Sequence, residues 1–256
     1  MTASEPPRTE HCDRSGRPTM TYVRASDDGR SAAFGVQPVA GVDLADVVDL
    51  IGSDLGGWVV SGPGELGDRL AARGAQVRRR FHVLTRPLAD DLPPAAWAET
   101  DLGAGRRAVR VDRDPDEVFP AWRAAYPPGH TDRHPGSDEE ALAERLRPLL
   151  AGELGPLLPA SRLAVDADDR VVAGVVLLQS PRGPWVADVF RRPGAEQAGL
   201  GAALLRRVIA TAAQDGISEL GLSVSDGNPA RRVYEKLGFY TTADLVTVIV
   251  PEISSK

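Results

Sequence analysis

The sequence predicts an α/β protein, because short β-type runs alternate with helical patterns along most of its 256 residues. A second observation agrees with this class. Hydrophobic residues make up 42% of the chain, which is ample for a buried core at this length. We therefore expect a globular chain that forms one large domain, or a domain with a smaller unit attached.

The N-terminal part of the chain divides into three stretches. Residues 1–30 are polar and rich in Pro, Arg and Asp, so they bury too little apolar surface to offset the entropy lost on ordering, and we expect a disordered tail. Residues 31–87 alternate strand-like runs with two helical patterns, which predicts a small α/β unit. Residues 88–106 are again polar and rich in Pro and indicate a linker.

Residues 107–256 hold a longer α/β segment. Its elements follow in the order strand, two helices, three strands, helix, strand, helix, strand. Asp114 before Pro115 predicts the start of the first helix, and Ser137 before a run of acidic residues predicts the start of the second. A third helix over residues 200–214 has its Leu, Val and Ile side chains on one face.

Composition excludes several classes of function. The net charge of −6 and the pI of about 5.3 argue against a nucleic-acid partner. No run approaches the roughly 18 apolar residues of a membrane span. The single cysteine, Cys12, permits no intrachain disulfide, and the first residues lack the apolar core of a secretion signal. We expect a cytoplasmic protein without nucleic-acid or membrane partners.

A glycine-bearing turn opens the third helix. Gly199 and Gly201 stand where a strand gives way to a helix, so backbone N–H groups can face an anion there. A P-loop is excluded because Leu200 replaces its Lys, and a dinucleotide fingerprint is excluded because Leu204 replaces its third Gly. On its own the pair fits either a phosphate site or a plain tight turn.

A second motif lies about thirty residues further on. The stretch "VFRRPGAEQAGLGAALL" followed by "NPARRVYEKLGF" resembles the GNAT superfamily of N-acetyltransferases, and the element order over residues 107–251 resembles that whole fold. The resemblance implies a mixed, mostly antiparallel central sheet flanked by helices. It also implies acetyl-CoA as co-substrate and no metal.

The resemblance further implies which residues bind acetyl-CoA. The turn amides would hold the pyrophosphate, the preceding strand would pair with the pantetheine arm, and a later Asn and Tyr would lie beside the cofactor. The predicted contacts are Val189, Phe190, Arg191, Glu196, Gln197, Ala198, Gly199, Leu200, Gly201, Ala202, Asn228 and Tyr234. Glu196 departs from the family, which usually has Arg or Gln there. Asn228 could also serve as a helix N-cap.

Two residues are candidates for acid–base work. Tyr234 is protonated at neutral pH and could stabilise or protonate the sulfur of coenzyme A; a core aromatic is the alternative. Asp188 lies in the strand beside the expected cofactor, where an acidic residue is unusual, and is the candidate base. A surface carboxylate or a water chain would serve as alternatives.

The loop between the first two helices of this segment resembles the one that closes over the acceptor in the family. It contains His130 and His134, and we place them with Tyr126 as candidate acceptor contacts. Solvated loop residues are the alternative. The surrounding Pro and Gly argue against the helix that an i, i+4 histidine pair would need to bind a metal.

The small unit over residues 31–87 could be a degenerate half-repeat of the same fold. An offset of 164 residues aligns Gly74 with Gly238, Leu70 with Tyr234 and Gly64 with Asn228, so the expected active-site residues are absent there. The glycine turn is missing as well.

We therefore predict an acetyl-CoA-dependent N-acetyltransferase that acts on a primary amine of a small molecule or a peptide. A non-catalytic acyl-CoA-binding or regulatory protein is the main alternative, and transfer to a hydroxyl is another. The oligomeric state stays open, with a homodimer as one option.

Overall fold

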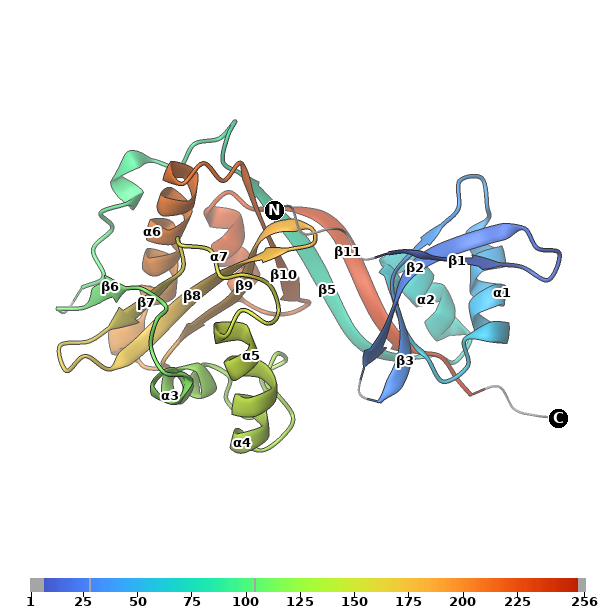
Figure 1. Cartoon of the computed structure of the whole chain (residues 1–256), viewed down its shortest axis with the longest axis horizontal. Coiled ribbons are helices and arrows are strands. Elements are labelled where there is room, and N and C mark those ends of the chain that lie inside the picture. The colour runs from blue at the N-terminus through green and yellow to red at the C-terminus, as the bar shows by residue number, and fades with distance from the viewer. Residues whose placement is uncertain (1–6, 28, 104, 253–256) are drawn as a thin grey trace. The chain divides into compact units, whose positions relative to one another are not determined.

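The structure is a computed structural model that describes residues 7–27, 29–103 and 105–252. It divides into two compact units (Figure 1). The C-terminal unit contains the described residues of 84–223 and residues 228–240. The N-terminal unit contains the described residues up to 83, residues 224–227 and residues 241–252.

Two strands, β5 and β11, have residues in both units. In the N-terminal unit the order of neighbouring strands is β1-β2-β3-β4-β11-β5, and in the C-terminal unit it is β5-β10-β9-β8-β7-β6. Strand β5 (Gln76–Pro87) passes from the first unit into the second at Leu84, and β11 (Tyr240–Ile249) returns after Tyr240. The sequence predicts that residues 107–256 form one domain. In the structure, the last strand of this segment, β11, lies mostly in the N-terminal unit.

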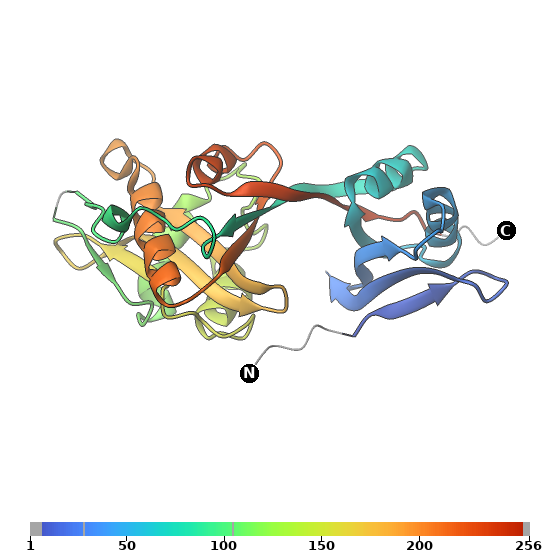
Figure 2. The same ribbon diagram turned by 90° about the horizontal axis from the view of Figure 1, so that it is seen from above.

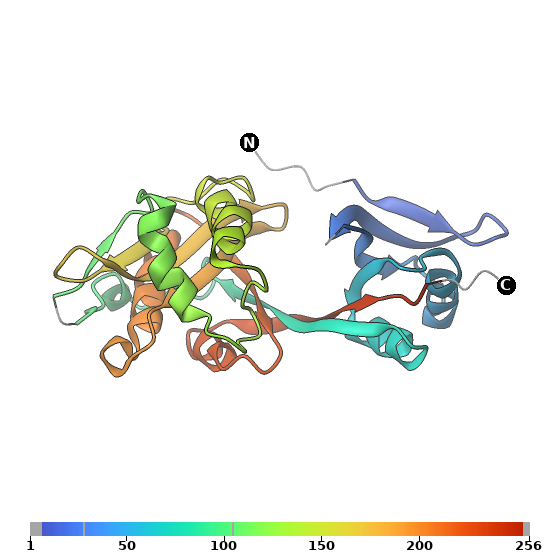
Figure 3. The same cartoon turned by 90° about the horizontal axis from the view of Figure 1, so that it is seen from below.

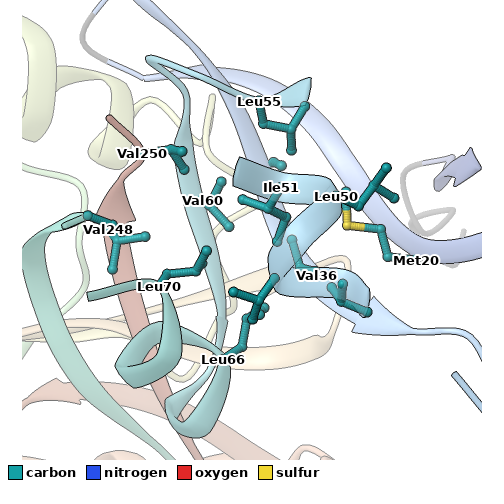
Figure 4. Close-up of a cluster of buried hydrophobic side chains, with 14 of the residues drawn as sticks. Met20, Val36, Leu50, Ile51, Leu55, Val60, Leu66, Leu70, Val248 and Val250 are labelled. Carbon is teal, nitrogen blue, oxygen red and sulfur yellow. The ribbon is translucent and has the colours of Figure 1, made fainter. Parts of the chain in front are cut away.

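The N-terminal unit packs two helices against its strands. Its remaining elements are β1 (Thr9–Cys12), β2 (Pro18–Asp27), β3 (Arg30–Pro38), α1 (Leu44–Asp54), β4 (Val59–Pro63) and α2 (Gly64–Ala72). Apolar side chains from both helices and from β2, β3, β4 and β11 form one buried cluster, including Met20, Val36, Ile51, Leu66, Leu70 and Val248 (Figure 4).

The predicted disordered tail is wrong over residues 9–27. These residues form β1 and β2, which pair with each other, and β2 pairs antiparallel with β3. The reason is a period of two in β2 that places Met20 and Tyr22 in the core at 0% and 2% exposure, so the stretch does bury apolar surface. Residues 1–6 of the predicted tail lie outside the described residues.

The C-terminal unit has helices on both faces of its strands. The strands are β6 (Arg107–Val109), β7 (Arg162–Val165), β8 (Val171–Ser180), β9 (Gly183–Arg191) and β10 (Glu219–Ser225). Helix α6 (Leu200–Gln214) covers one face (Figure 2). Helix α3 (Pro115–Ala125) covers the other face with the helical segment from α4 (Asp138–Ala141) through a π-helical turn (Leu142–Leu146) to α5 (Arg147–Leu150) (Figure 3).

Helix starts in this unit follow the predicted caps. The Asp114 side chain accepts a hydrogen bond from the Asp116 N–H, with Pro115 at the first position of α3. Ser137 and Glu140 form a reciprocal capping box at the start of α4. Helix α7 (Ala230–Lys236) completes the unit.

The stretch predicted as a linker, residues 88–106, is instead packed within the C-terminal unit. Leu88 and Leu102 are buried, the Leu88 N–H donates to the Ser218 carbonyl, and Arg207 donates to the Thr100 carbonyl. A short 3-10 turn (Ala95–Trp97) lies in this stretch. Leu88 and Leu102 anchor this stretch to the unit, whereas Leu92 is exposed, and composition alone does not indicate which of them is buried.

The fold class agrees with the prediction. Antiparallel pairing links β6 to β7, β7 to β8 and β8 to β9, while β9 and β10 run parallel. The C-terminal unit is thus a mixed, mostly antiparallel sheet flanked by helices, and the N-terminal unit is a smaller α/β unit.

Candidate active site

A bulge in β9 places a carboxylate inside the C-terminal unit. Val176 of β8 pairs with Asp188, but the next residue, Leu177, pairs with Val186, so Ala187 is left over. Such bulges change the direction in which neighbouring side chains point. Asp188 contacts α3 and is only 7% exposed. The surface carboxylate considered as an alternative is therefore not what the structure contains.

Helix α3 holds both oxygens of this carboxylate. The Trp122 Nε1–H donates to Asp188 Oδ2 at 2.8 Å, and the Tyr126 hydroxyl donates to Asp188 Oδ1 at 2.5 Å. Trp122 lies in the last turn of α3 and Tyr126 is the C-cap residue four positions later, and their rings meet edge to face with centroids 5.5 Å apart.

Burial sets the ionisation of the pair. It raises the pKa of Asp188 above that of an ordinary aspartate, although the hydrogen bonds from Tyr126 and Trp122 oppose the shift. Burial, followed by the charge of Asp188, raises the pKa of Tyr126 well above the ordinary tyrosine value. The phenol therefore keeps its proton at neutral pH.

Helix α7 brings Tyr234 to the same place. Burial raises the pKa of its hydroxyl, and the charges of Asp188 and Asp132 raise it further, so both carboxylates act on this phenol. The half-buried Tyr234 ring packs edge to face on Phe239 at 6.0 Å. Gly238, at φ +86°, ends the helix where the Arg86 guanidinium leaves no room for a Cβ.

The loop after α3 reaches the start of α7. Asn228 uses its amide twice: Oδ1 accepts from the Ala230 N–H at 2.9 Å, and Nδ2 donates to Asp132 at 2.8 Å. Asn228 thus binds the first N–H of α7 from one residue before the N-cap position, which Pro229 occupies, and a cofactor contact by Asn228 stays a prediction. His130 packs edge to face on Tyr126 at 5.2 Å. The Arg133 guanidinium donates to the Tyr126 carbonyl.

His134 lies apart from this group. Its Nδ1 accepts from the Gly136 N–H, and its Nε2 faces Glu144 at 3.5 Å. The two histidines of the loop therefore point to different partners. Among the described residues, no group of three or more His, Cys, Asp and Glu side chains is placed to hold a metal ion.

The glycine turn lies at the N-terminus of α6. Gly199 has φ +79° and stands at the N-cap position, where no described side chain caps the helix. The first N–H groups of a helix have no partner within it, and the helix dipole adds positive character. Leu200, Gly201 and Ala202 supply these groups here.

Buried and exposed residues alternate around this turn. Gln197 and Leu200 are buried, whereas Glu196, Ala198, Gly199 and Arg191 are exposed. The Glu196 carboxylate folds back over Gly194, whose Cβ position lies 2.5 Å from its oxygen, and Arg106 donates to the Glu196 carbonyl at 2.7 Å. The side chain that departs from the family pattern thus has its own place beside the turn.

Strands β9 and β10 separate next to the turn. In the described part of the chain they pair only at Trp185 with Gly221 and Val186 with Leu222. From Ala187 to Arg191, β9 continues along β8, and the described residues of β10 do not pair with it there. This leaves one backbone edge of β9 available between Asp188 and the start of α6. The Phe190 side chain points away, into the core under α3.

Residues predicted from the sequence thus meet in one unit. The structure brings Tyr126, Asp188, Tyr234 and His130 together, joins Asn228 to them through Asp132, and leads β9 to the glycine turn. The sequence analysis missed Trp122 and Asp132. Trp122 had a signal, the i, i+4 spacing to Tyr126 on a predicted helix; Asp132 had none.

Comparison with known proteins assigns part of the chain to a family. Residues 116–239 match the Acetyltransferase (GNAT) family, and this range contains Trp122, Tyr126, Asp188, the glycine turn and Tyr234. This part of the chain is a GNAT domain. A search of curated proteins gave no match.

Solved structures resemble the chain beyond the GNAT domain. A GCN5-related N-acetyltransferase from Sphaerobacter thermophilus is 19% identical with a TM-score of 0.60, covering 95% of this chain and 81% of that one. One from Kribbella flavida is 18% identical with a TM-score of 0.53, covering 92% and 88%. A tandem GNAT protein from the clavulanic acid biosynthesis pathway is 15% identical with a TM-score of 0.56, covering 95% and 82%. At these identities the likeness concerns the fold.

The GNAT family implies acyltransferase activity, which makes the cluster and the turn the two halves of a candidate active site. In the described chain, no helix combines the length and apolar character needed to cross a membrane.

Proposed function

We propose that this protein is an acetyl-CoA-dependent N-acetyltransferase that transfers an acetyl group to a primary amine of a small molecule or a peptide. The observation that supports the proposal is that buried Asp188 acts on the half-buried Tyr234, at the end of an open edge of β9 that leads to the uncapped start of α6. The GNAT family match supports the choice of reaction.

The residues present fit coenzyme A. The N–H groups that open α6 would hold the pyrophosphate, and the free edge of β9 from Val189 to Arg191 would pair with the amide groups of the pantetheine arm. The Cδ of Arg191 lies beside Gly201 in the first turn of α6, and the guanidinium donates to the Arg192 carbonyl at 3.0 Å. Bound acetyl-CoA supplies the thioester; the chain supplies its orientation.

The protein groups divide the proton transfers. Tyr234 keeps its proton at neutral pH because burial and two carboxylates raise its pKa, so it can hydrogen-bond or protonate the departing thiolate. Asp188 has a raised pKa and is the final acceptor for the proton that the attacking amine loses. His130 and Tyr126 would line the acceptor side.

Thiol release measures this activity directly. The purified chain is mixed with acetyl-CoA and a panel of alkylamines, amino sugars and short peptides, and free coenzyme A is followed with a thiol reagent. Multiple turnovers with at least one amine, and an acetylated product of the expected mass, are the predicted result. Binding of acetyl-CoA without turnover on any amine would contradict the proposal and favour a non-catalytic role.

A further inference from the structure

Asp188 is too enclosed to meet an acceptor directly. It is 7% exposed, and each of its oxygens already accepts a hydrogen bond from α3. The donors, Trp122 and Tyr126, are neutral, and Arg145 acts on the carboxylate only through space. A base in this position needs an intermediate group to collect a proton from the substrate.

The Tyr126 hydroxyl is the group in place to do so. It donates a hydrogen bond to Asp188, and Tyr126 as a residue is half-buried, whereas Asp188 is buried. Tyr126 and Tyr234 interact electrostatically, and the charge of Asp188 acts on both phenols. The end of α3 therefore holds a relay candidate, and α7 holds the candidate acid.

We propose that Tyr126 is a further catalytic residue, which takes a proton from the acceptor's ammonium group while passing its own hydroxyl proton to Asp188, and that the acceptor is consequently an amine that is cationic at neutral pH. The inference rests on the proposed function. Trp122 is a positioning residue in this scheme, because it holds the second carboxylate oxygen.

The proton transfers balance. One N–H bond of the ammonium breaks as an O–H bond forms at Tyr126, and the original Tyr126 O–H breaks as one forms at Asp188 Oδ1. The neutral nitrogen then forms a bond to the thioester carbonyl carbon, and the carbon–sulfur bond breaks. Tyr234 gives its proton to the thiolate and regains one from the acylated nitrogen. Asp188 finally returns its proton to solvent.

Charged groups around the relay set its direction. Burial and the charge of Asp132 raise the pKa of Asp188, whereas its two hydrogen bonds and Arg145 lower it, and the net direction is upward. A carboxylate with a raised pKa holds a transferred proton better. The groups that face the relay are Trp122 from α3, His130 and Asp132 from the following loop, Arg145 from the π-helical turn and Tyr234 from α7.

Two probes separate a relay from a structural role. The wild-type protein and Tyr126→Phe are assayed by thiol release between pH 6 and pH 10. The probes are the alkylamine with the highest turnover in the panel, which is a cation at neutral pH, and aniline, which is neutral there. The expected loss in Tyr126→Phe is about 100-fold in kcat for the alkylamine near pH 7. This loss should shrink as the pH approaches that of the neutral amine, and turnover of aniline should change by less than about threefold.

Matched variants identify the source of the loss. Tyr240→Phe makes the same chemical change at a residue that is 53% exposed and should leave both rates unchanged. An acetyl-CoA affinity within twofold of wild type shows that Tyr126→Phe is folded. Should Phe fail to fold at position 126, Asp188→Asn, which keeps the shape of the carboxylate, should give the same pH-dependent loss.

Each remaining outcome would overturn the relay. A loss in Tyr126→Phe that is equal at every pH and for both amines would reduce Tyr126 to a packing role. An unchanged rate would remove it altogether. Failure of the wild-type protein to turn over any amine would contradict the proposed function itself and the relay with it, which distinguishes the two failures.

Discussion

The two units each contain a helix that begins after a turn, and these two helices begin in different ways. In the N-terminal unit, α1 is capped by Asp43, whose carboxylate accepts the Ala45 N–H at 2.7 Å. In the C-terminal unit, α6 starts at Gly199, with no capping side chain among the described residues. A capping carboxylate satisfies the helix N–H groups and adds negative charge, whereas a glycine leaves those groups for an external anion.

The second difference between the units concerns the helix that follows the next strand. The offset of 164 residues that aligns Gly74 with Gly238 also aligns the first residues of β5 and β11, Gln76 and Tyr240. Both glycines have positive φ, at +93° and +86°. Leu70 stands where Tyr234 stands and is 3% exposed in the core. Aligned positions thus hold a core leucine in one unit and the candidate acid in the other. The matching glycines and strand starts are consistent with the predicted half-repeat.

The largest expected effects come from changing these two residues one at a time. Tyr234→Phe should lower kcat by about 10²- to 10⁴-fold, the usual contribution of a general acid, while leaving the free energy of unfolding within about 1 kcal/mol. Leu70→Ala should do the reverse, because it removes buried apolar volume: unfolding becomes easier by about 2–5 kcal/mol and turnover per folded molecule stays the same. Steady-state kinetics and urea unfolding of both variants measure the pair. An equal loss of kcat in Tyr234→Phe and Leu70→Ala would show that the two residues do not differ in their role in turnover.

A capping side chain added at the start of α6 tests the difference between the two helix starts. Gly199→Asp copies the cap of the N-terminal unit and places a carboxylate where the pyrophosphate is expected, at a cost of about 1–4 kcal/mol for like charges at close range. Acetyl-CoA affinity should fall by about fivefold or more relative to Gly199→Asn, which tolerates the same left-handed backbone without the charge. Titration calorimetry compares the two variants. Equal affinities would show that no anion is bound at this helix start.

The buried carboxylate predicts a pH effect on stability. Because the pKa of Asp188 is raised on folding, the folded protein holds its proton to a higher pH than the unfolded chain does. Its contribution to stability is therefore fully present below the ordinary aspartate range and is lost as the pH rises through the raised pKa, by at most about 1.4 kcal/mol per pH unit.

Asp188→Asn removes this titration. Compared with wild type, the variant should gain relative stability between pH 4 and pH 7 in denaturant unfolding. Asp168→Asn, at a side chain that is 71% exposed, should show no such trend. A stability difference between Asp188→Asn and wild type that stays constant with pH would contradict the shift.

The smallest effect is expected from removing the N-cap side chain of α1. Asp43→Ala removes the hydrogen bond to the Ala45 N–H and should lower the free energy of unfolding by about 1 kcal/mol. Turnover and acetyl-CoA affinity should not change. A second molecule of acetyl-CoA bound by this variant would show that the N-terminal unit keeps a hidden site.

Local chemistry explains which parts of this structure were predictable. The caps at Asp114 and Ser137 were read correctly because each depends on residues within one helical turn. The strand containing Met20 and Tyr22 was missed because the polar composition around it outweighed its period of two. The crossing of β5 and β11 between the units depends on pairing over long sequence separations, for which neighbouring residues give no signal.

The candidate site divides in the same way. Tyr234 and Asp188 were found through family resemblance and through the oddity of an acid in a strand. Their environment was not, because the contact between Asp188 and Tyr126 joins residues 62 positions apart and depends on the bulge at Ala187. A bulge of one residue decides whether a strand side chain faces α3 or the opposite face of the sheet.

Titration calorimetry of the intact protein with acetyl-CoA tests the central claim that an uncapped α6, and not a capped α1, binds the diphosphate. The account predicts one molecule bound per chain and a marked loss of affinity in Gly199→Asp. No heat of binding at millimolar acetyl-CoA, or two equivalent molecules per chain, would contradict it.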